Sequence, residues 1–251
     1  MTSYHDDIMG ISDKNEMGFL DHLEELRWRL VRTLVGIIFF SALSYFYIDE
    51  ILYFFLKPAK NTKSYIALQS LQVQSMFMIK WYVSFISGFV LSVPHTVYQS
   101  WKFVAPGLKV NEKKIIIPVV VLASLSFGIG ITFGYVVIVP FSLEFFSSIS
   151  SQHVENNFSI QYYFSFMAWL MIGAGLIFQL PVVSLLLSAI GILTPAFMRH
   201  YRKYSIIVIL ILSSFITPPD PVSMLLMAFP LVILYETSIG VSWLVNRSKH
   251  N

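Results

Sequence analysis

The stretch His22-Leu23-Glu24-Glu25-Leu26-Arg27-Trp28-Arg29-Leu30 places two carboxylates and two guanidinium groups directly before a long apolar run. This run, from Leu30 to Ile48, holds one charged residue, Arg32, near its start. Its 19 residues would form a helix about 28 Å long at about 1.5 Å per residue, close to the thickness of the hydrocarbon core of a bilayer. The sequence therefore predicts a membrane-spanning helix whose charged start lies at the water boundary.

The composition indicates a membrane protein. Hydrophobic residues make up 56% of the 251 residues and charged residues only 12%, far from the balance of a typical soluble domain. The chain has no cysteine, which excludes disulfides, thiolate metal sites and cysteine nucleophiles. Residues 1–29 lack the basic start, short apolar stretch and small-residue site of a cleaved signal, so we expect none.

Five further apolar segments follow the first one. They lie at about residues 81–101, 115–139, 163–190, 204–217 and 222–245. Six spans place both termini on the same side, and 13 of the 17 lysines and arginines then lie on that side. Because lysine and arginine accumulate on the cytoplasmic side, the sequence predicts an all-α polytopic membrane protein with six transmembrane helices and both termini cytoplasmic.

This topology divides the chain into three parts. Residues 1–29 form a cytoplasmic N-terminal segment, residues 30–245 a single six-helix transmembrane domain, and residues 246–251 a cytoplasmic tail. Residues 102–114 and 191–203 are expected to face the cytoplasm as well. The fifth span has about 14 residues, or about 21 Å of helix, which is short for a bilayer.

Two longer segments are expected on the outer side. Asp49 to Lys80 is rich in aromatic and aliphatic residues, which indicates short interfacial helices rather than a free loop. Lys80 itself belongs to no evident cluster and is interpreted as a packing or interface residue. Ser147 to Asn157 is polar and is expected to be an exposed loop. In the third span, Gly130 and Gly134 form a GxxxG step, the spacing at which helices pack closely.

Three motifs outside the spans occur in the same order as in a known family. They are His22-Leu23-Glu24-Glu25-Leu26-Arg27, Phe103-Val104-Ala105-Pro106-Gly107-Leu108 followed by Asn111-Glu112-Lys113-Lys114, and Thr217-Pro218-Pro219-Asp220-Pro221-Val222-Ser223. Together with six spans and a matching orientation, they resemble the TatC family, the multispanning receptor subunit of the twin-arginine protein translocase. The resemblance extends from about Met17 to Val245, nearly the whole chain.

The resemblance implies a function and a set of partners. A protein of this kind is expected to bind the twin-arginine signal peptides of folded precursor proteins. With small single-span subunits of the TatA and TatB type, it would move these proteins across the membrane using the proton-motive force. The resemblance further implies a bowl of six tilted helices, self-association, and a location in the bacterial inner (plasma) membrane or in an organellar membrane.

The resemblance also identifies peptide-binding residues, and their chemistry agrees with it. Guanidinium groups are best recognised by fixed carboxylates that accept bidentate hydrogen bonds. Glu25 before the first span and Glu112 in the first cytoplasmic loop match the family's positions for this role. Phe103 matches a position beside the binding patch, and Arg27 and Lys114 of the same motifs complete the expected site.

These residues also have structural interpretations. Asp21 and Glu24 resemble a capping box, which we prefer for Glu24. Glu25 stands four residues before Arg29, the favourable spacing for an intrahelical ion pair, and the residues alone leave this as open as a binding site. The loop acid, beside two lysines, is otherwise one more charge in a basic loop. Phe103 is equally typical of an aromatic anchor at the membrane interface.

Four polar residues lie within or near the spans, where an unpaired ionisable group is costly: Glu144, Gln179, Asp220 and Glu236. Relatives carry glutamate or glutamine at the position of Gln179, and the neutral amide weakens any proton-carrying role. Asp220 is best explained as the cap of the sixth span. Glu236 is the best candidate for an interior polar contact. We therefore expect intramembrane or partner contacts at Gln179, Asp220 and Glu236.

Other classes of function find little support. The GxxxxGK[ST], HExxH and GxSxG motifs do not occur, so we expect no enzyme activity, no cofactor and no metal. Basic residues lie near the membrane ends rather than among aromatic residues on a polar domain, which argues against nucleic-acid binding. The alternative is a proton-coupled small-solute transporter with Glu144 and Glu236 as relay groups, although the chain lacks the two related halves typical of such transporters.

Overall fold

The computed structural model describes residues 19–61, 67–104, 116–148, 157–189, 191–217 and 221–250, and almost all of them are helical. The helices are α1 (Phe19–Phe46), α2 (Ile48–Asn61), α3 (Ser75–Val104), α4 (Ile116–Phe133), α5 (Val139–Ser148), α6 (Ile160–Ile177), α7 (Leu180–Ala189), α8 (Pro195–His200), α9 (Arg202–Ile216) and α10 (Pro221–His250). A π-helical turn, Gly134–Ile138, joins α4 to α5. Two short strands, β1 (Ala67–Gln69) and β2 (Asn157–Ser159), complete the described elements.

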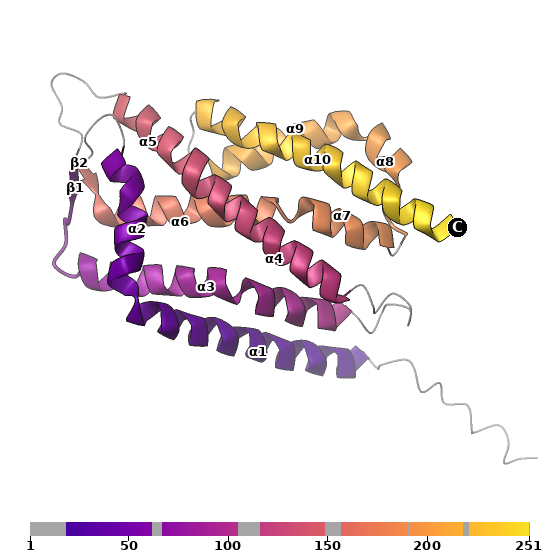
Figure 1. Ribbon diagram of the computed structural model, residues 1–251, viewed down its shortest axis with the longest axis horizontal. Helices are drawn as coiled ribbons and strands as arrows, with labels where there is room; N and C mark the ends of the chain where they lie inside the picture. The colour runs from indigo at the N-terminus through magenta and orange to yellow at the C-terminus, as the bar shows by residue number, and fades with distance from the viewer. Residues whose placement is uncertain are drawn as a thin grey trace, which may run out of the picture.

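Several helical stretches are long and apolar enough to cross a membrane. In the described part of the chain there are five: Leu20–Phe46, Ser75–Phe103, Ile117–Ser148, Ile160–Ala189 and Ser223–Leu244. They confirm the expected all-α protein with several membrane spans. The start of α1, the end of α3 and the end of α10 lie at one end of the molecule, which we call the terminal end (Figure 1). The other end, with α2, β1 and β2, is called the α2 end.

The expected fifth span corresponds to α9. This helix has 15 residues and is about 22 Å long at about 1.5 Å per residue, less than the thickness of a bilayer. It packs against α10, the last helix, and lies beside it in Figure 1. The short length predicted from the sequence is therefore confirmed, whereas a sixth crossing of the membrane stays a prediction.

Prolines interrupt two of the expected spans. The sequence predicts one span over residues 163–190, but the helix breaks at Phe178, between α6 and α7. Pro181 has no amide hydrogen, so it cannot donate to the carbonyl of Ile177 four residues earlier. In the third span, Pro140 is the second residue after the π-helical turn, and the same missing donor favours an irregular turn there.

An antiparallel pair, α1 and α3, forms one side of the molecule (Figure 1). Near the middle, a Cβ added at Gly88 of α3 would lie 2.3 Å from the amide nitrogen of Ser41 on α1, so only glycine allows this approach. Closer to the terminal end, Nε2 of His95 lies 3.2 Å from the carbonyl oxygen of Arg32. These contacts fix the register of the two helices.

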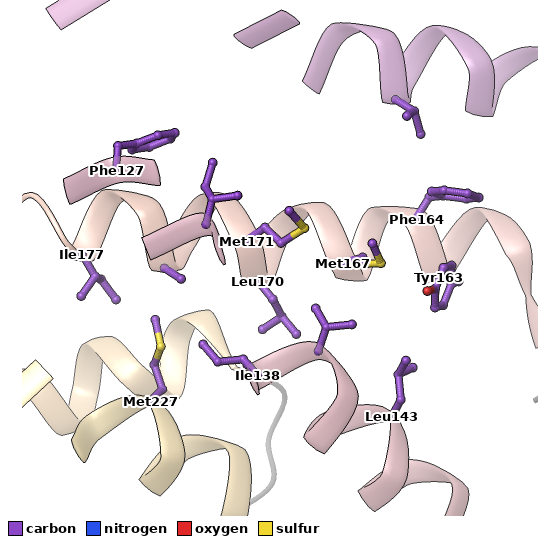
Figure 2. Close-up of a cluster of buried hydrophobic side chains, with 14 of the residues drawn as sticks. Phe127, Ile138, Leu143, Tyr163, Phe164, Met167, Leu170, Met171, Ile177 and Met227 are labelled. Atoms are coloured by element: carbon purple, nitrogen blue, oxygen red, sulfur yellow. The ribbon is translucent and has the colours of Figure 1, made fainter. Parts of the chain in front are cut away.

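The buried core surrounds α6, whose side chains meet those of the π-helical turn and α10 (Figure 2). Met167 and Ala174 of α6 are at most 1% exposed. A Cβ added at Gly130 of α4 would lie 2.7 Å from the carbonyl oxygen of Ala174, and one added at Gly134 would lie 3.0 Å from Cα of Met171. The close helix packing expected of the GxxxG step is therefore confirmed.

One helix and a pair of strands close the α2 end. In Figure 1, α2 lies across the ends of the long helices. The hydroxyl of Tyr135 donates to the carbonyl oxygen of Phe54 at 2.8 Å, and that of Tyr163 donates to the carbonyl oxygen of Phe55 at 2.7 Å. Strand β1 pairs with β2 in parallel, which ties the segment after α2 to the segment before α6.

The expectations for the α2 end are partly wrong. Between Asp49 and Lys80 the described residues contain one short helix, α2, rather than several, together with β1 and the first residues of α3, which begins at Ser75. Three residues carry no readable periodicity, and the partner strand lies far away in the sequence, so the pattern could not predict β1. The loop expected from Ser147 to Asn157 is also too long, because α5 continues to Ser148, Ser147 is buried and Asn157 begins β2. Residues 149–156 lie outside the described residues.

Candidate functional site

A polar cluster lies at the terminal end of the α1–α3 pair. Glu25 and Arg29 stand one turn apart on α1, and Nε of Arg29 donates a hydrogen bond of 3.0 Å to Oε1 of Glu25. Nη2 of the same guanidinium donates to the same oxygen. The side chain of Arg29 is 13% exposed and that of Glu25 is 20% exposed, so water reaches little of the pair. The intrahelical ion pair that the spacing allows is therefore present.

An aromatic contact joins this pair to α3. The ring of Phe103 stacks on the imidazole of His22, with ring centroids 4.3 Å apart and planes 16° from parallel. Nδ1 of His22 lies 3.9 Å from Oε2 of Glu25. The structure therefore brings Glu25 and Phe103, which are far apart in the sequence, to one place, with His22 between them.

Several buried polar atoms at this end lack a hydrogen-bond partner among the residues that the structure describes. They include Oε2 of Glu25, Nη1 of Arg29 and Oε1 of Gln99. Gln99 is buried and lies one turn before Phe103 on α3. Since leaving a buried polar group unpaired costs about 1–3 kcal/mol, such groups are normally satisfied. The two open acceptors suit a ligand that brings hydrogen-bond donors.

Other charged residues of the first motif point elsewhere. Glu24 and Arg27 are exposed, and Arg27 lies about 200° around the helix from Glu25, since successive residues are about 100° apart. The capping box predicted for Asp21 and Glu24 is wrong, because α1 already begins at Phe19 and Asp21 lies inside its first turn. There the negative charge of Asp21 suits the positive end of the helix dipole.

Three of the predicted site residues, Glu112, Lys114 and Asp220, lie outside the described residues. The position of Glu112 relative to Glu25, and the cap by Asp220, therefore stay predictions. Helix α10 begins at Pro221, a residue well suited to the first turn of a helix because its missing amide hydrogen is not needed there.

Two of the expected intramembrane contacts are made within this chain. Nε2 of Gln179, in the turn between α6 and α7, donates to the carbonyl oxygen of Ala123 on α4 at 3.0 Å. Glu236 of α10 accepts from Arg202 at the start of α9, with Nε 2.8 Å from Oε1 and Nη2 2.9 Å from Oε2. Both charged side chains are about half exposed, so their exposed faces remain available to a partner helix, and the interior position expected of Glu236 stays a prediction.

Sequence reasoning did not assign a role in the site to His22, Gln99 or Arg202. Helical spacing offers a signal for the first two, because each lies one turn before a residue that was predicted. No spacing rule identifies Arg202, whose partner lies 34 residues away on another helix. Lys80, interpreted as belonging to no cluster, donates to Oδ1 of Asp49 at 2.8 Å and ties α3 to α2.

The fold and this cluster define a multi-pass, predominantly helical membrane protein with a polar cluster at one end of its helices. Within the described ranges, no group of three or more histidine, aspartate or glutamate side chains could hold a metal ion.

Comparison with known proteins narrows this class to one family. A family model of the Sec-independent protein translocase protein (TatC) matches residues 21–230. The Sec-independent protein translocase protein TatC of Helicobacter pylori is 39% identical over 225 residues, which are 90% of this chain and 87% of the relative. The TatC protein of Halalkalibacterium halodurans is 33% identical, over 94% of this chain and 92% of the relative. A crystal structure of the twin-arginine translocase receptor TatC superposes with a TM-score of 0.77 at 29% identity, covering 90% of this chain and 99% of that chain.

The chain belongs to the TatC family. Members of this family are components of a protein translocase, and the resemblance given by the three sequence motifs is confirmed. The relatives named above are all translocase proteins, so they give the solute-transporter alternative no support.

Proposed function

We propose that this chain is the receptor of a twin-arginine translocase and that it binds the paired arginines of signal peptides at the terminal end of the α1–α3 pair. One observation carries the proposal: among the described residues, the largely buried Oε2 of Glu25 has no hydrogen-bond partner, and it lies 3.9 Å from His22, whose ring stacks on Phe103. An arginine side chain can donate to such an oxygen and can stack on an aromatic ring. The crystal structure that this chain resembles is described as the twin-arginine translocase receptor TatC, which supports the same conclusion.

Recognition is assigned to Glu25 and Glu112 jointly. Two carboxylates on different segments allow each arginine of the pair its own partner. Phe103, Arg27 and Lys114 lie in the same two motifs and complete the site. Arg27, exposed on another face of α1, is suited to contact a part of the peptide other than its arginines.

Gln179, Glu236 and Asp220 have a supporting role in this proposal. Gln179 and Glu236 hold neighbouring helices together through the contacts described above. Asp220 is assigned the role of capping α10. The receptor works with TatA- and TatB-type single-span subunits and with further copies of itself, and moves folded proteins using the proton-motive force. It needs no cofactor and catalyses no reaction.

We also propose the finer topology: six spans in the plasma membrane, with α9 as the short fifth span and both termini cytoplasmic. Residues 1–29, 30–245 and 246–251 are then the cytoplasmic segment, the transmembrane domain and the tail. The excess of lysine and arginine on one side supports this orientation. The common end shared by the start of α1 and the end of α10 supports an even number of spans (Figure 1).

The topology can be tested by labelling, since the chain has no native cysteine. Cysteines introduced singly at Asn111 and Asn156 should react with a membrane-impermeant thiol reagent from opposite sides of the membrane. Reaction from the same side would contradict the six-span proposal.

The binding proposal can be tested by alanine substitution in the full-length protein in lipid nanodiscs. Glu25→Ala and Glu112→Ala should each weaken binding of a twin-arginine signal peptide by roughly 1–3 kcal/mol, about five- to 150-fold. Glu24→Ala is the matched control, because it removes a neighbouring carboxylate that is exposed, and it should leave the dissociation constant nearly unchanged. Glu25→Gln retains shape and separates lost charge from lost packing. Unchanged binding in both site variants would show that these acids are only helix and loop charges.

A further inference from the structure

In this structure Arg29 already occupies the carboxylate to which we assign ligand binding. Its Nε and Nη2 both donate to Oε1 of Glu25. A complete arginine–carboxylate pair uses both carboxylate oxygens, in two parallel hydrogen bonds. Here Oε2 of Glu25 and Nη1 of Arg29 are buried and have no hydrogen-bond partner within the described ranges, so the pair is incomplete.

Oε1 of Gln99 is a third polar atom without a described hydrogen-bond partner, and Gln99 lies at the same height along the helix pair. Gln99 lies on α3 between Phe103, which stacks on His22, and His95, which contacts α1 at the carbonyl of Arg32. The ion pair lies between the same two contact points on α1. Because α1 and α3 run side by side in opposite directions (Figure 1), these two contacts place Gln99 and the ion pair at about the same level along the helix pair. The amide oxygen of Gln99 is buried and unpaired in the described part of the chain.

We propose that Arg29 is an internal substitute for an arginine of the signal peptide, and that Arg29, Glu25 and Gln99 form an arginine latch. In the free protein, Arg29 neutralises Glu25, which would otherwise be an isolated and largely buried charge. A peptide guanidinium first donates to the open Oε2 and then takes the whole carboxylate. The displaced Arg29 turns its open Nη1 to the amide oxygen of Gln99. This inference rests on the proposed function, because it takes Glu25 as the carboxylate that binds the ligand.

The latch has a consequence for affinity. Any ligand must compete with Arg29, so its apparent affinity falls with the fraction of molecules in which the carboxylate is already taken. A peptide arginine can replace the bidentate fork of Arg29, whereas a lysine offers a single compact charge and replaces it less well. Because the fraction of taken carboxylates is the same for both ligands, the latch lowers both apparent affinities by one factor, and the preference for arginine comes from the contact with the carboxylate.

The experiment measures the dissociation constant of a fluorescent peptide, with two adjacent arginines before an apolar segment, for the full-length protein in nanodiscs. Arg29→Gln should tighten binding by about five- to tenfold, because the internal competitor is gone. Arg32→Gln removes the same charge one turn further along α1 and should change binding by less than about twofold. Weaker or unchanged binding to Arg29→Gln, or equal tightening by Arg32→Gln, would overturn the latch.

A second substitution tests the role of Gln99. Gln99→Leu should weaken binding to the otherwise native protein by about threefold, because displaced Arg29 loses its acceptor. In the Arg29→Gln background it should have no effect, and an equal effect in both backgrounds would overturn the proposal.

If Arg29→Gln does not fold, Arg29→Lys provides the test: about twofold tighter binding is expected, since a single ammonium holds the carboxylate less well. Weaker or unchanged binding would again count against the latch.

Glu25→Gln distinguishes the failure of the latch from the failure of the proposed function. If Glu25→Gln weakens peptide binding but Arg29→Gln does not tighten it, only the latch is wrong. If Glu25→Gln leaves binding unchanged, the assignment of Glu25 to recognition is wrong, and the latch fails with it.

Discussion

The molecule contains two acid–arginine pairs that differ in almost every respect. Arg29 and Glu25 lie one turn apart on α1, are largely buried, and use one oxygen of the carboxylate. Arg202 and Glu236 join two helices, are about half exposed, and use both oxygens in a bidentate pair. The second pair uses both carboxylate oxygens, whereas the first leaves one buried acceptor oxygen without a hydrogen-bond partner among the residues that the structure describes.

This difference separates a structural pair from a binding site. A bidentate pair across α9 and α10 fixes two helices and has no carboxylate oxygen left for a ligand. An incomplete pair within one helix adds no contact between helices. Its unpaired buried oxygen lowers the stability of the protein until a further hydrogen-bond donor binds to it. The contrast predicts that charge changes at the two sites have different consequences.

The largest difference is expected for charge reversal. Glu25→Lys should weaken twin-arginine peptide binding by about 100-fold or more, because repulsion is added to a lost contact. Glu236→Lys should change the same dissociation constant by less than about threefold, since its carboxylate is already used by Arg202. Peptide titrations of both variants, after a thermal-unfolding check, measure the difference. If both variants lost peptide affinity equally, the two pairs could not be divided into a binding site and a structural pair.

Exchanging the acid and the arginine within each pair should give a smaller effect. It distinguishes a pair that contributes to stability from one that binds the peptide. Glu236→Gln should lower the stability of the detergent-solubilised protein by about 0.5–1 kcal/mol, because the pair is half exposed. The double variant Glu236→Arg with Arg202→Glu should recover most of that loss, since the pair acts only within the chain. The corresponding swap, Glu25→Arg with Arg29→Glu, should not recover peptide binding, because the carboxylate moves by one helical turn. Recovery of full binding in the second swap would contradict the site.

Much of the fold could be predicted from apolar run lengths. The runs identified the long helices and also the unusually short α9, because a membrane-spanning helix has a length fixed by the bilayer. The break before Pro181 could have been predicted from the missing amide hydrogen, but the apolar run continues through it. Strand β1 could not be predicted from the sequence, because its partner strand β2 lies in a distant segment of the chain.

The candidate site was predictable only within one helix. The spacing of Glu25 and Arg29 is visible in the sequence, and the structure contains that pair. The register between α1 and α3 decides that His22 stacks on Phe103 and that Gln99 lies at the height of the ion pair. Contacts between residues far apart in the sequence determine this register. The capping interpretation failed because the start of a helix depends on residues before the charged motif.

The most direct test of the account compares two peptides on two proteins. A signal peptide with its paired arginines, and the same peptide with paired lysines, are titrated against the native protein and against Glu25→Gln in nanodiscs. The native protein should bind the arginine peptide about tenfold or more tightly than the lysine peptide, since lysine cannot form the bidentate contact. In Glu25→Gln this preference should fall to about threefold, because one of the two charged acceptors is gone while Glu112 keeps its own arginine. A preference that persists unchanged in Glu25→Gln would contradict the claim that this carboxylate reads the paired arginines.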